Sequence, residues 1–272
     1  MNTEEIMGLA LKLADMKSVP ADSAIHVPGN NVEKVLLCID ADPAELMLAK
    51  NLGCDAVITH HPIGKASLNF HMVFDRHVDY MLEHGVPKQK AEEAVKKLKD
   101  RVALRNHTTI YTHTVAAAEK LKMPLVNIHL PCDELMRRTI LAQLKSNRIE
   151  KVSDIKSSVE KIPEFRNAAT EVQVPYGDPS SNVGKYALVV AAGTNGGYAI
   201  AKAYFEHGVS TVIYLHVNGE DLAKLKEDKV QGNLVILGHL AGDSVGLNQL
   251  ANALEKEGIE VVKLGILERD VQ

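Results

Sequence analysis

The same strand–helix–strand arrangement occurs twice in this chain, and that repeat limits the folds open to it. The apolar run KVLLCID, from Lys34, is followed by a helix-forming stretch and by a second apolar run, DAVITHH. Further along, YALVVAAG is followed by NGGYAIAKAYFEH and then by VSTVIYLHV. A glycine ends each predicted helix, Gly53 and Gly208, and the spacing from there to His61 and His216 is the same. Apolar strands joined through helices are typical of parallel sheets with both faces covered.

A second pair of strands extends the repeat and predicts two lobes. PLVNIHLPCD and NLVILGHLAGD both carry a His-Leu-x-x-Asp pattern after an apolar run. Self-similarity of this kind indicates units built on one plan. The expected fold is therefore α/β, with two pseudo-symmetric α/β lobes. We expect a first lobe over 1–150, a linker over 151–185 and a second lobe over 186–272.

A helical insertion is expected in the first lobe at about 70–105. Its pattern indicates two amphipathic helices that are separated at GVPK. A lid over a binding site, an oligomer contact and an extra structural layer are three interpretations that the sequence leaves open.

Histidines and acids follow the predicted strands at the points where the strands end. Neighbouring side chains of an ideal strand point to opposite faces, but Pro62 turns the chain directly after His60 and His61, so both can face one site. Ligands gather beyond the carboxyl ends of parallel strands. We therefore expect one polar cluster there, made of His60, His61, His129, Asp133, His239 and Asp243.

This mixture of imidazoles and carboxylates, with no thiolate, suits divalent ions. Zinc, manganese, iron and nickel all accept such ligands. Two divalent metal ions at roughly 3.5–4 Å would activate a water molecule and stabilise an anionic transition state. His129 and His216 are the candidates for catalytic proton transfer.

Composition excludes several other classes of protein. A net charge of −4 and a pI of about 6.3 give no reason to expect nucleic-acid binding. Three cysteines in no paired spacing argue against a disulfide framework and favour a reducing, cytoplasmic location. Glu4 and Glu5 stand where an export signal would be positive, and we expect no membrane-spanning segment.

These motifs, in this order, resemble those of the Nif-three-like dinuclear metal proteins, which include GTP cyclohydrolase I type 2 homologues. That family has a strand ending in a HHP triplet (ITHHP here), then a His-Thr-x-x-Asp stretch (HLPCD here) and a late Gly-His-x-x-x-Glu helix start (GHLAGD here). The resemblance covers residues 32–64, 124 to about 144, and 186 to the end. It implies toroidal homohexamers of two-lobed subunits, the NIF3-like fold, with a metal pair in the cleft of each subunit.

The resemblance also implies a set of ligands. His60 and Asp133 would bind one metal ion, and His61 and His239 would bind the other. Asp243 stands where the family has a bridging glutamate, which is longer by one methylene.

Three more features depend on the match. His129 corresponds to a family histidine that contacts a metal-binding residue or faces the substrate. His216 stands where family members often have a Thr-Gly-acid turn. The family's early Trp-Asp-Asn-x-Gly stretch is not visible, and SAIHVPGNN occupies that region.

Two functions from different classes follow. The first is a metal-dependent hydrolase, like a GTP cyclohydrolase I type 2, that acts on a small anionic or nucleotide-like substrate. The alternative is a non-catalytic metal-binding scaffold or a regulatory protein-interaction module. A third hypothesis, nucleotide binding at the glycine-rich turn GTNGG, leaves the histidines at the strand ends unexplained, and an ordinary turn between strand and helix is the better interpretation.

Overall fold

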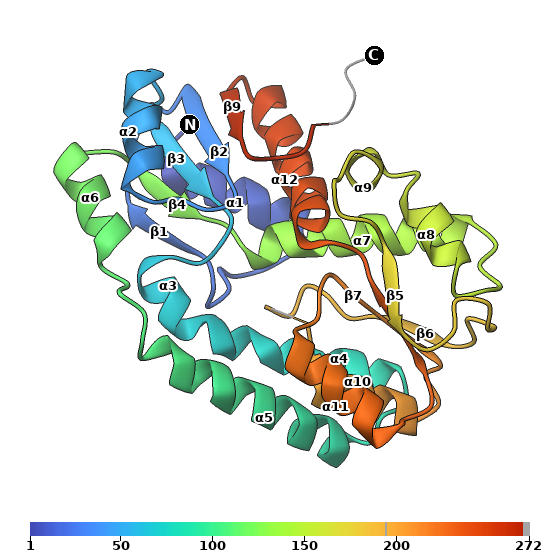
Figure 1. Cartoon of the computed structure of the whole chain (residues 1–272). Coiled ribbons are helices and arrows are strands. Elements are labelled where there is room, and N and C mark those ends of the chain that lie inside the picture. Colours follow the sequence, from blue (N-terminus) through green and yellow to red (C-terminus); the bar gives the residue numbers. More distant parts are fainter. Residues whose placement is uncertain (194, 269–272) are drawn as a thin grey trace. The chain divides into compact units, whose positions relative to one another are not determined.

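The computed structural model describes residues 1–193 and 195–268, which form two sheets with flanking helices (Figure 1). This confirms the expected α/β fold class. The described residues fall into two compact units, each made of separate segments. The first unit consists of Met1–Val73, Ala103–Leu135 and Asp243–Ile266. The second consists of Phe74–Val102, Met136–Gly242 and, at the end of the described residues, Leu267 and Glu268.

The first sheet has the strand order β1-β4-β3-β2-β9. Its strands are β1 (Ala24–Val27), β2 (Lys34–Cys38), β3 (Ala56–Thr59), β4 (Leu125–Asn127) and β9 (Glu260–Leu264). The pairs β2–β3 and β3–β4 are parallel, as the apolar runs predict. β9 is also parallel to β2, and β1 is antiparallel to β4.

Both faces of this sheet are covered by helices, because its strands alternate apolar side chains between two cores. Leu37 and Ile58 point into the core beneath α1 (Thr3–Leu13) and α12 (His239–Lys256). Leu36 and Val57 point into the opposite core, beneath α2 (Pro43–Asn51) and α6 (His113–Leu121) (Figure 1).

Local sequence explains where α2 begins and where it ends. Asp42 and Glu45 form a capping box around Pro43, so the first backbone donors of the helix are satisfied. Gly53 follows the helix with φ of +70°, a left-handed conformation that glycine adopts without steric cost.

The expected insertion is helical. It comprises α3 (Gly64–Asn69), the 3-10 segment η1 (Phe70–Asp75), α4 (Arg76–Glu83) and α5 (Lys88–Asn106). Contacts within the second unit hold residues 74–102 of it: Arg76 Nε donates to the carbonyl of Ala191 (3.0 Å), and Lys185 Nζ donates to the carbonyl of His84 (2.5 Å). These contacts support the extra-layer interpretation for residues 74–102.

The second sheet has the order β5-β8-β7-β6. It is formed by β5 (Gln173–Tyr176), β6 (Tyr186–Leu188), β7 (Thr211–Tyr214) and β8 (Asn233–Ile236), with α10 (Gly197–Glu206) and α11 (Gly219–Asp228) between parallel strands. The segment expected as a linker contains α8 (Asp154–Val159), α9 (Pro163–Arg166) and β5, after α7 (Leu130–Ser146).

The compact units therefore differ from the expected consecutive stretches, 1–150 and 186–272. The reason is long-range pairing, because β9 comes last in the chain but pairs with β2 of the first sheet. Within residues 1–193 and 195–268, no helix has both the length and the apolar character needed to cross a membrane.

Candidate metal centre

Five of the predicted site residues come together at the carboxyl edge of the first sheet. His60 and His61 directly follow β3, His129 lies two residues beyond β4, Asp133 lies in the first turn of α7, and Asp243 is on α12. Two groups have all of their ligand atoms within 4.8 Å of one another: His60 with His61 and His129, and His60 with Asp133 and Asp243. The first unit therefore contains a cluster with the composition of a metal site.

The two adjacent histidines face one site because the strand ends before them. The backbone N–H groups of His60 and His61 both donate to the carbonyl of Ile39, at 3.1 and 2.9 Å. This shared acceptor marks a bend at the end of β3, after which the chain continues into Pro62. The ring centroids of the two imidazoles lie 5.3 Å apart.

Hydrogen bonds at Nδ1 orient both of these imidazoles. Nδ1–H of His60 donates to the carbonyl of Ile128 (3.1 Å), and Nδ1–H of His61 donates to Oδ1 of Asp40 (2.7 Å). Since carbonyl and carboxylate oxygens only accept, Nδ1 carries the proton in each ring. Nε2 is then the nitrogen that faces the cluster, which is the arrangement typical of metal-binding histidines.

His129 follows the same rule with a different partner. Its Nδ1–H donates to Oδ2 of Asp22 (2.8 Å), and its ring stacks on that of His60 with 4.6 Å between centroids. Asp22 was not predicted from the sequence. Its only sequence signal is its place just before the strand AIHV, which does not indicate a partner more than a hundred residues away.

The buried carboxylates surround Nε2 of His60. This atom lies 3.3 Å from Oδ1 of Asp133 and 3.7 Å from Oδ1 of Asp243, yet no aligned hydrogen bond satisfies it among the described residues. All three side chains are almost fully buried. Burying two carboxylates beside an imidazole is costly unless a positive charge compensates them. The donor set therefore fits a bound cation.

The pKa values reflect the same preference for positive charge. Burial lowers the pKa of His60, but the charges of Asp243 and Asp133 outweigh it and place the pKa well above the usual value. Burial also lowers the pKa of His61, and hydrogen bonds to Asp243 and Asp40 outweigh it, raising the pKa to about 9. In the metal-free protein, protons occupy the nitrogens to which an ion would bind.

The other two predicted histidines belong to the second unit. His239 is the first residue of α12, one helical turn before Asp243, and His216 lies two residues beyond β7. Both side chains are exposed, and their ring centroids lie 4.8 Å apart. Their predicted roles, in metal binding and in proton transfer, stay predictions.

The glycine-rich turn GTNGG lies before α10, and its Thr194 lies outside the described residues. Oδ1 of Asn195 accepts the backbone N–H of Leu215 (2.8 Å), so this side chain is used to join the turn to the end of β7.

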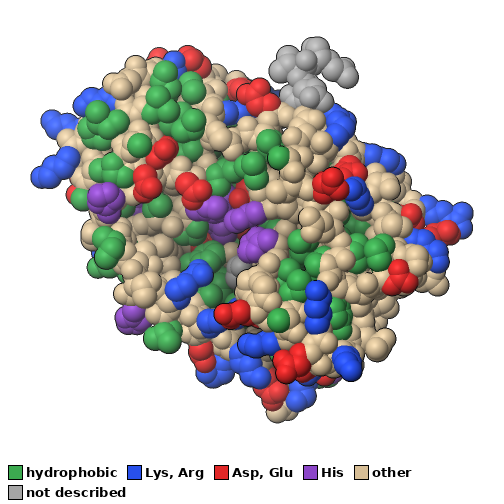
Figure 2. All heavy atoms as spheres, viewed as in Figure 1, with side chains coloured by type: hydrophobic (Ala, Val, Ile, Leu, Met, Phe, Trp, Pro, Cys, Tyr) green, Lys and Arg blue, Asp and Glu red, His purple; other side chains and the backbone are tan. Residues whose placement is uncertain are grey.

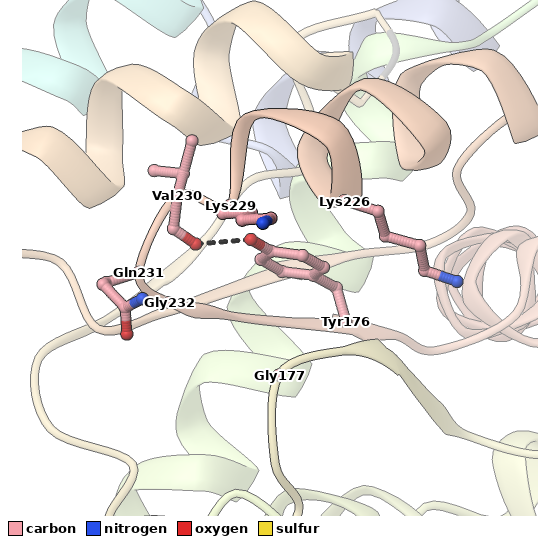
Figure 3. Close-up of a pocket in the computed structure, with 7 residues that line it drawn as sticks. All are labelled: Tyr176, Gly177, Lys226, Lys229, Val230, Gln231 and Gly232. Atoms are coloured by element: carbon pink, nitrogen blue, oxygen red, sulfur yellow. Dashed lines mark hydrogen bonds between the residues drawn. The ribbon is translucent and has the colours of Figure 1, made fainter.

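A pocket of about 320 Å³ lies elsewhere in the second unit (Figure 3). It is lined by Tyr176, Gly177, Lys226, Lys229, Val230, Gln231 and Gly232. The hydroxyl of Tyr176 donates to the carbonyl of Val230 (2.5 Å), which ties β5 to the segment before β8. None of these lining residues is a histidine, cysteine or acid, so the pocket does not resemble the cluster in the first unit.

The fold and the cluster define an α/β protein whose buried His/Asp groups can bind metal ions. The family model Duf34/NIF3 (NGG1p interacting factor 3) matches residues 22–87. A crystal structure of a NIF3 superfamily protein from Sphaerobacter thermophilus matches with 44% identity and a TM-score of 0.94, covering 98% of this chain and 99% of that chain. The chain therefore belongs to the NIF3 superfamily, as the motifs imply.

More distant structures share the fold alone. Reduced HcgD from Methanocaldococcus jannaschii has 15% identity and a TM-score of 0.60, covering 97% of this chain and 98% of that chain. A Bacillus cereus protein related to NIF3 has 10% identity and a TM-score of 0.50, covering 100% of this chain and 99% of that chain. A comparison with curated proteins found no match.

Proposed function

We propose that this protein is a metal-dependent hydrolase, similar to GTP cyclohydrolase I type 2, that acts on a small anionic or nucleotide-like substrate. The observation that carries the proposal is the cluster at the carboxyl edge of the first sheet, where three imidazoles with hydrogen-bonded Nδ1 atoms meet two buried carboxylates. Divalent ions bound there would lower the pKa of a water molecule and stabilise negative charge.

Asp243 suits the bridging position that the family gives to glutamate. Its Oδ1 lies 3.7 Å from Nε2 of His60 and its Oδ2 lies 3.4 Å from Nε2 of His61, so each carboxylate oxygen faces a different imidazole. This supports two ions per subunit, one held by His60 with Asp133 and the other by His61 with His239.

Within this proposal, His129 is better suited to metal binding than to proton transfer. Its Nδ1 is bonded to Asp22, and only 5% of the residue is exposed, so it has little access to water. The exposed His216 remains the candidate for moving a proton to or from a substrate.

The test combines metal analysis with activity. We expect close to two ions per chain in the purified protein, and hydrolysis of a member of a panel of nucleotides and phosphoesters that is lost in His61→Ala. Absence of bound metal in the wild type would contradict the proposal, because the proposed hydrolysis depends on bound metal. Metal binding without turnover would favour the scaffold alternative.

One observation favours the alternative of an interaction module. The exposed side of α2 carries an apolar stripe, Ala44, Met47, Leu48 and Leu52, and hydrophobic side chains gather on the surface where Figure 1 places this helix (Figure 2). Exposed apolar patches of this kind mark interaction sites.

The same stripe is a candidate contact for the homohexamer that the family resemblance implies. In that case Met47→Glu would lower the mass measured by light scattering, whereas Lys50→Glu on the same helix would not. We also propose a cytoplasmic location, which the three buried, free cysteines support.

A further inference from the structure

Asp22 is a carboxylate buried beside the metal centre with a single basic partner. It is 0% exposed, and among the described residues the only basic group within ion-pair distance of it is the imidazole of His129. Burying a carboxylate that has one such partner is costly. A positive charge on the far side of that ring would compensate for this cost.

The pairing of two strands places Asp22 there. β1 and β4 are antiparallel, with Ala24 opposite Asn127, and the same register continued by two residues brings Asp22 opposite His129. The segment is held at further points: Nδ2 of Asn127 donates to the backbone carbonyl of Asp22 (2.7 Å), and the backbone N–H of His129 donates to Oγ of Ser23 (2.9 Å). The sheet therefore fixes the backbone at Asp22, and this places its carboxylate beside His129.

His61 offers a comparison within the same cluster. Its Nδ1–H also donates to a carboxylate, that of Asp40, but this side chain is 81% exposed. Water and salt screen an exposed carboxylate and leave its side chain free to move, so it holds the ring in place less firmly than a buried one. The buried carboxylate is not screened in this way, so its hydrogen bond fixes the orientation of the ring more firmly.

We infer that Asp22 is a positioning residue for the metal centre, which holds His129 in the tautomer and rotation that direct Nε2 at a bound divalent ion. This inference rests on the proposed metal binding and adds a residue to it. The prediction is that Asp22 controls metal affinity through His129, whereas Asp40 contributes little through His61.

The experiment is a titration of the metal-free protein with Co²⁺, followed by visible absorption and repeated with Zn²⁺ in competition with a chelator. We expect Asp22→Ala to weaken binding by about 10- to 100-fold, the usual effect of removing a carboxylate that orients a metal-binding histidine. Asp22→Asn keeps an oxygen that can accept from Nδ1–H, so we expect it to restore part of the affinity. Asp40→Asn is the matched control and should change the affinity less than threefold.

A double-mutant cycle separates positioning from a purely structural role. If Asp22 acts through His129, Asp22→Ala adds no further loss of affinity to His129→Ala. A further loss in that background would overturn the inference, and so would wild-type affinity in a folded Asp22→Ala protein. If the wild type itself binds neither Co²⁺ nor Zn²⁺, the proposed function is overturned instead.

A second measurement applies if Asp22→Ala does not fold. In the metal-free Asp22→Asn protein, ¹⁵N chemical shifts of the imidazole report which ring nitrogen of His129 carries the proton. We expect the wild type to hold the proton at Nδ1 alone and the variant to show a mixture of tautomers. A single Nδ1–H tautomer in both proteins, together with wild-type metal affinity in Asp22→Asn, would overturn the inference.

Discussion

The two units use the same strand–helix–strand plan, yet their strand-end histidines differ in environment. In the first unit, His60 is fully buried, His129 is nearly so, and the carboxylates of Asp133 and Asp243 are buried beside them. In the second unit, His216 and His239 are exposed. The spacing from glycine to histidine is the same in both halves. The comparison teaches that the repeat sets the backbone plan, whereas burial together with acids determines which edge favours a cation.

The largest expected effect comes from removing the centre of the buried cluster. His60→Ala should lower metal affinity by more than about 100-fold, because it removes the one nitrogen that faces both Asp133 and Asp243. The matched variant His216→Ala should leave affinity within about twofold. Calorimetric titration of both proteins measures the two metal affinities. An equal loss of affinity in the two variants would contradict the difference between the units.

The pH dependence of metal binding tests the same asymmetry. Because the pKa of His61 is raised to about 9 and that of His60 is raised as well, both rings carry protons at neutral pH in the metal-free protein. Binding must release these protons, so affinity falls as pH falls, and the proton of His61 alone contributes about tenfold per pH unit below pH 9. Chelator competition from about pH 6 to pH 9 measures the slope. An affinity that does not change over this range would contradict the charge assignment.

A smaller effect is expected when Asp243 is lengthened to glutamate. The family has glutamate at this position, so the metal content of Asp243→Glu should stay level or rise. The extra methylene enters a buried site, and overpacking should reduce the free energy of unfolding by about 1–3 kcal/mol. Metal analysis and chemical denaturation give the two values. Complete loss of metal would mean that Asp243 does not correspond to the family's bridging residue.

The smallest effect should be the same in both units. Gly53 and Gly208 end equivalent helices with φ of +70° and +84°, and a Cβ added at either position would contact nothing within 4 Å. Gly53→Ala and Gly208→Ala should each cost about 1 kcal/mol of unfolding free energy from backbone strain alone. Metal affinity should not change in either variant. Unequal costs would show that the two helix ends are not equivalent.

Much of the fold can be predicted from the sequence, because it depends on local patterns. The apolar runs predict β2, β3 and β4, and the capping residues at Asp42 and Glu45 predict the start of α2. The convergence of His60, His61, His129, Asp133 and Asp243 also follows, since strand ends of a parallel sheet meet at one edge.

The remaining features depend on contacts between distant segments. Asp22 reaches His129 only because β1 pairs antiparallel with β4, and no local pattern sets that register. β9 joins the first sheet by pairing with β2, and residues 74–102 group with the second unit through contacts such as that of Arg76 with Ala191. Packing between distant segments determines these arrangements, and a local sequence pattern does not show which segments pack together.

Helix α12 packs four apolar side chains, Leu247, Leu250, Ala251 and Leu254, into the core of the first sheet while presenting Asp243 to the end of β3. An ion shared by Asp243 and His60 would consequently cross-link a strand and a helix separated by most of the chain. Its binding energy would add to the resistance of that helix to unfolding, by about 1.4 kcal/mol for every tenfold rise in free ion above the dissociation constant. Amide exchange along α12 would then slow in proportion to ion concentration, so the exchange rate of this helix would report the concentration of free ion.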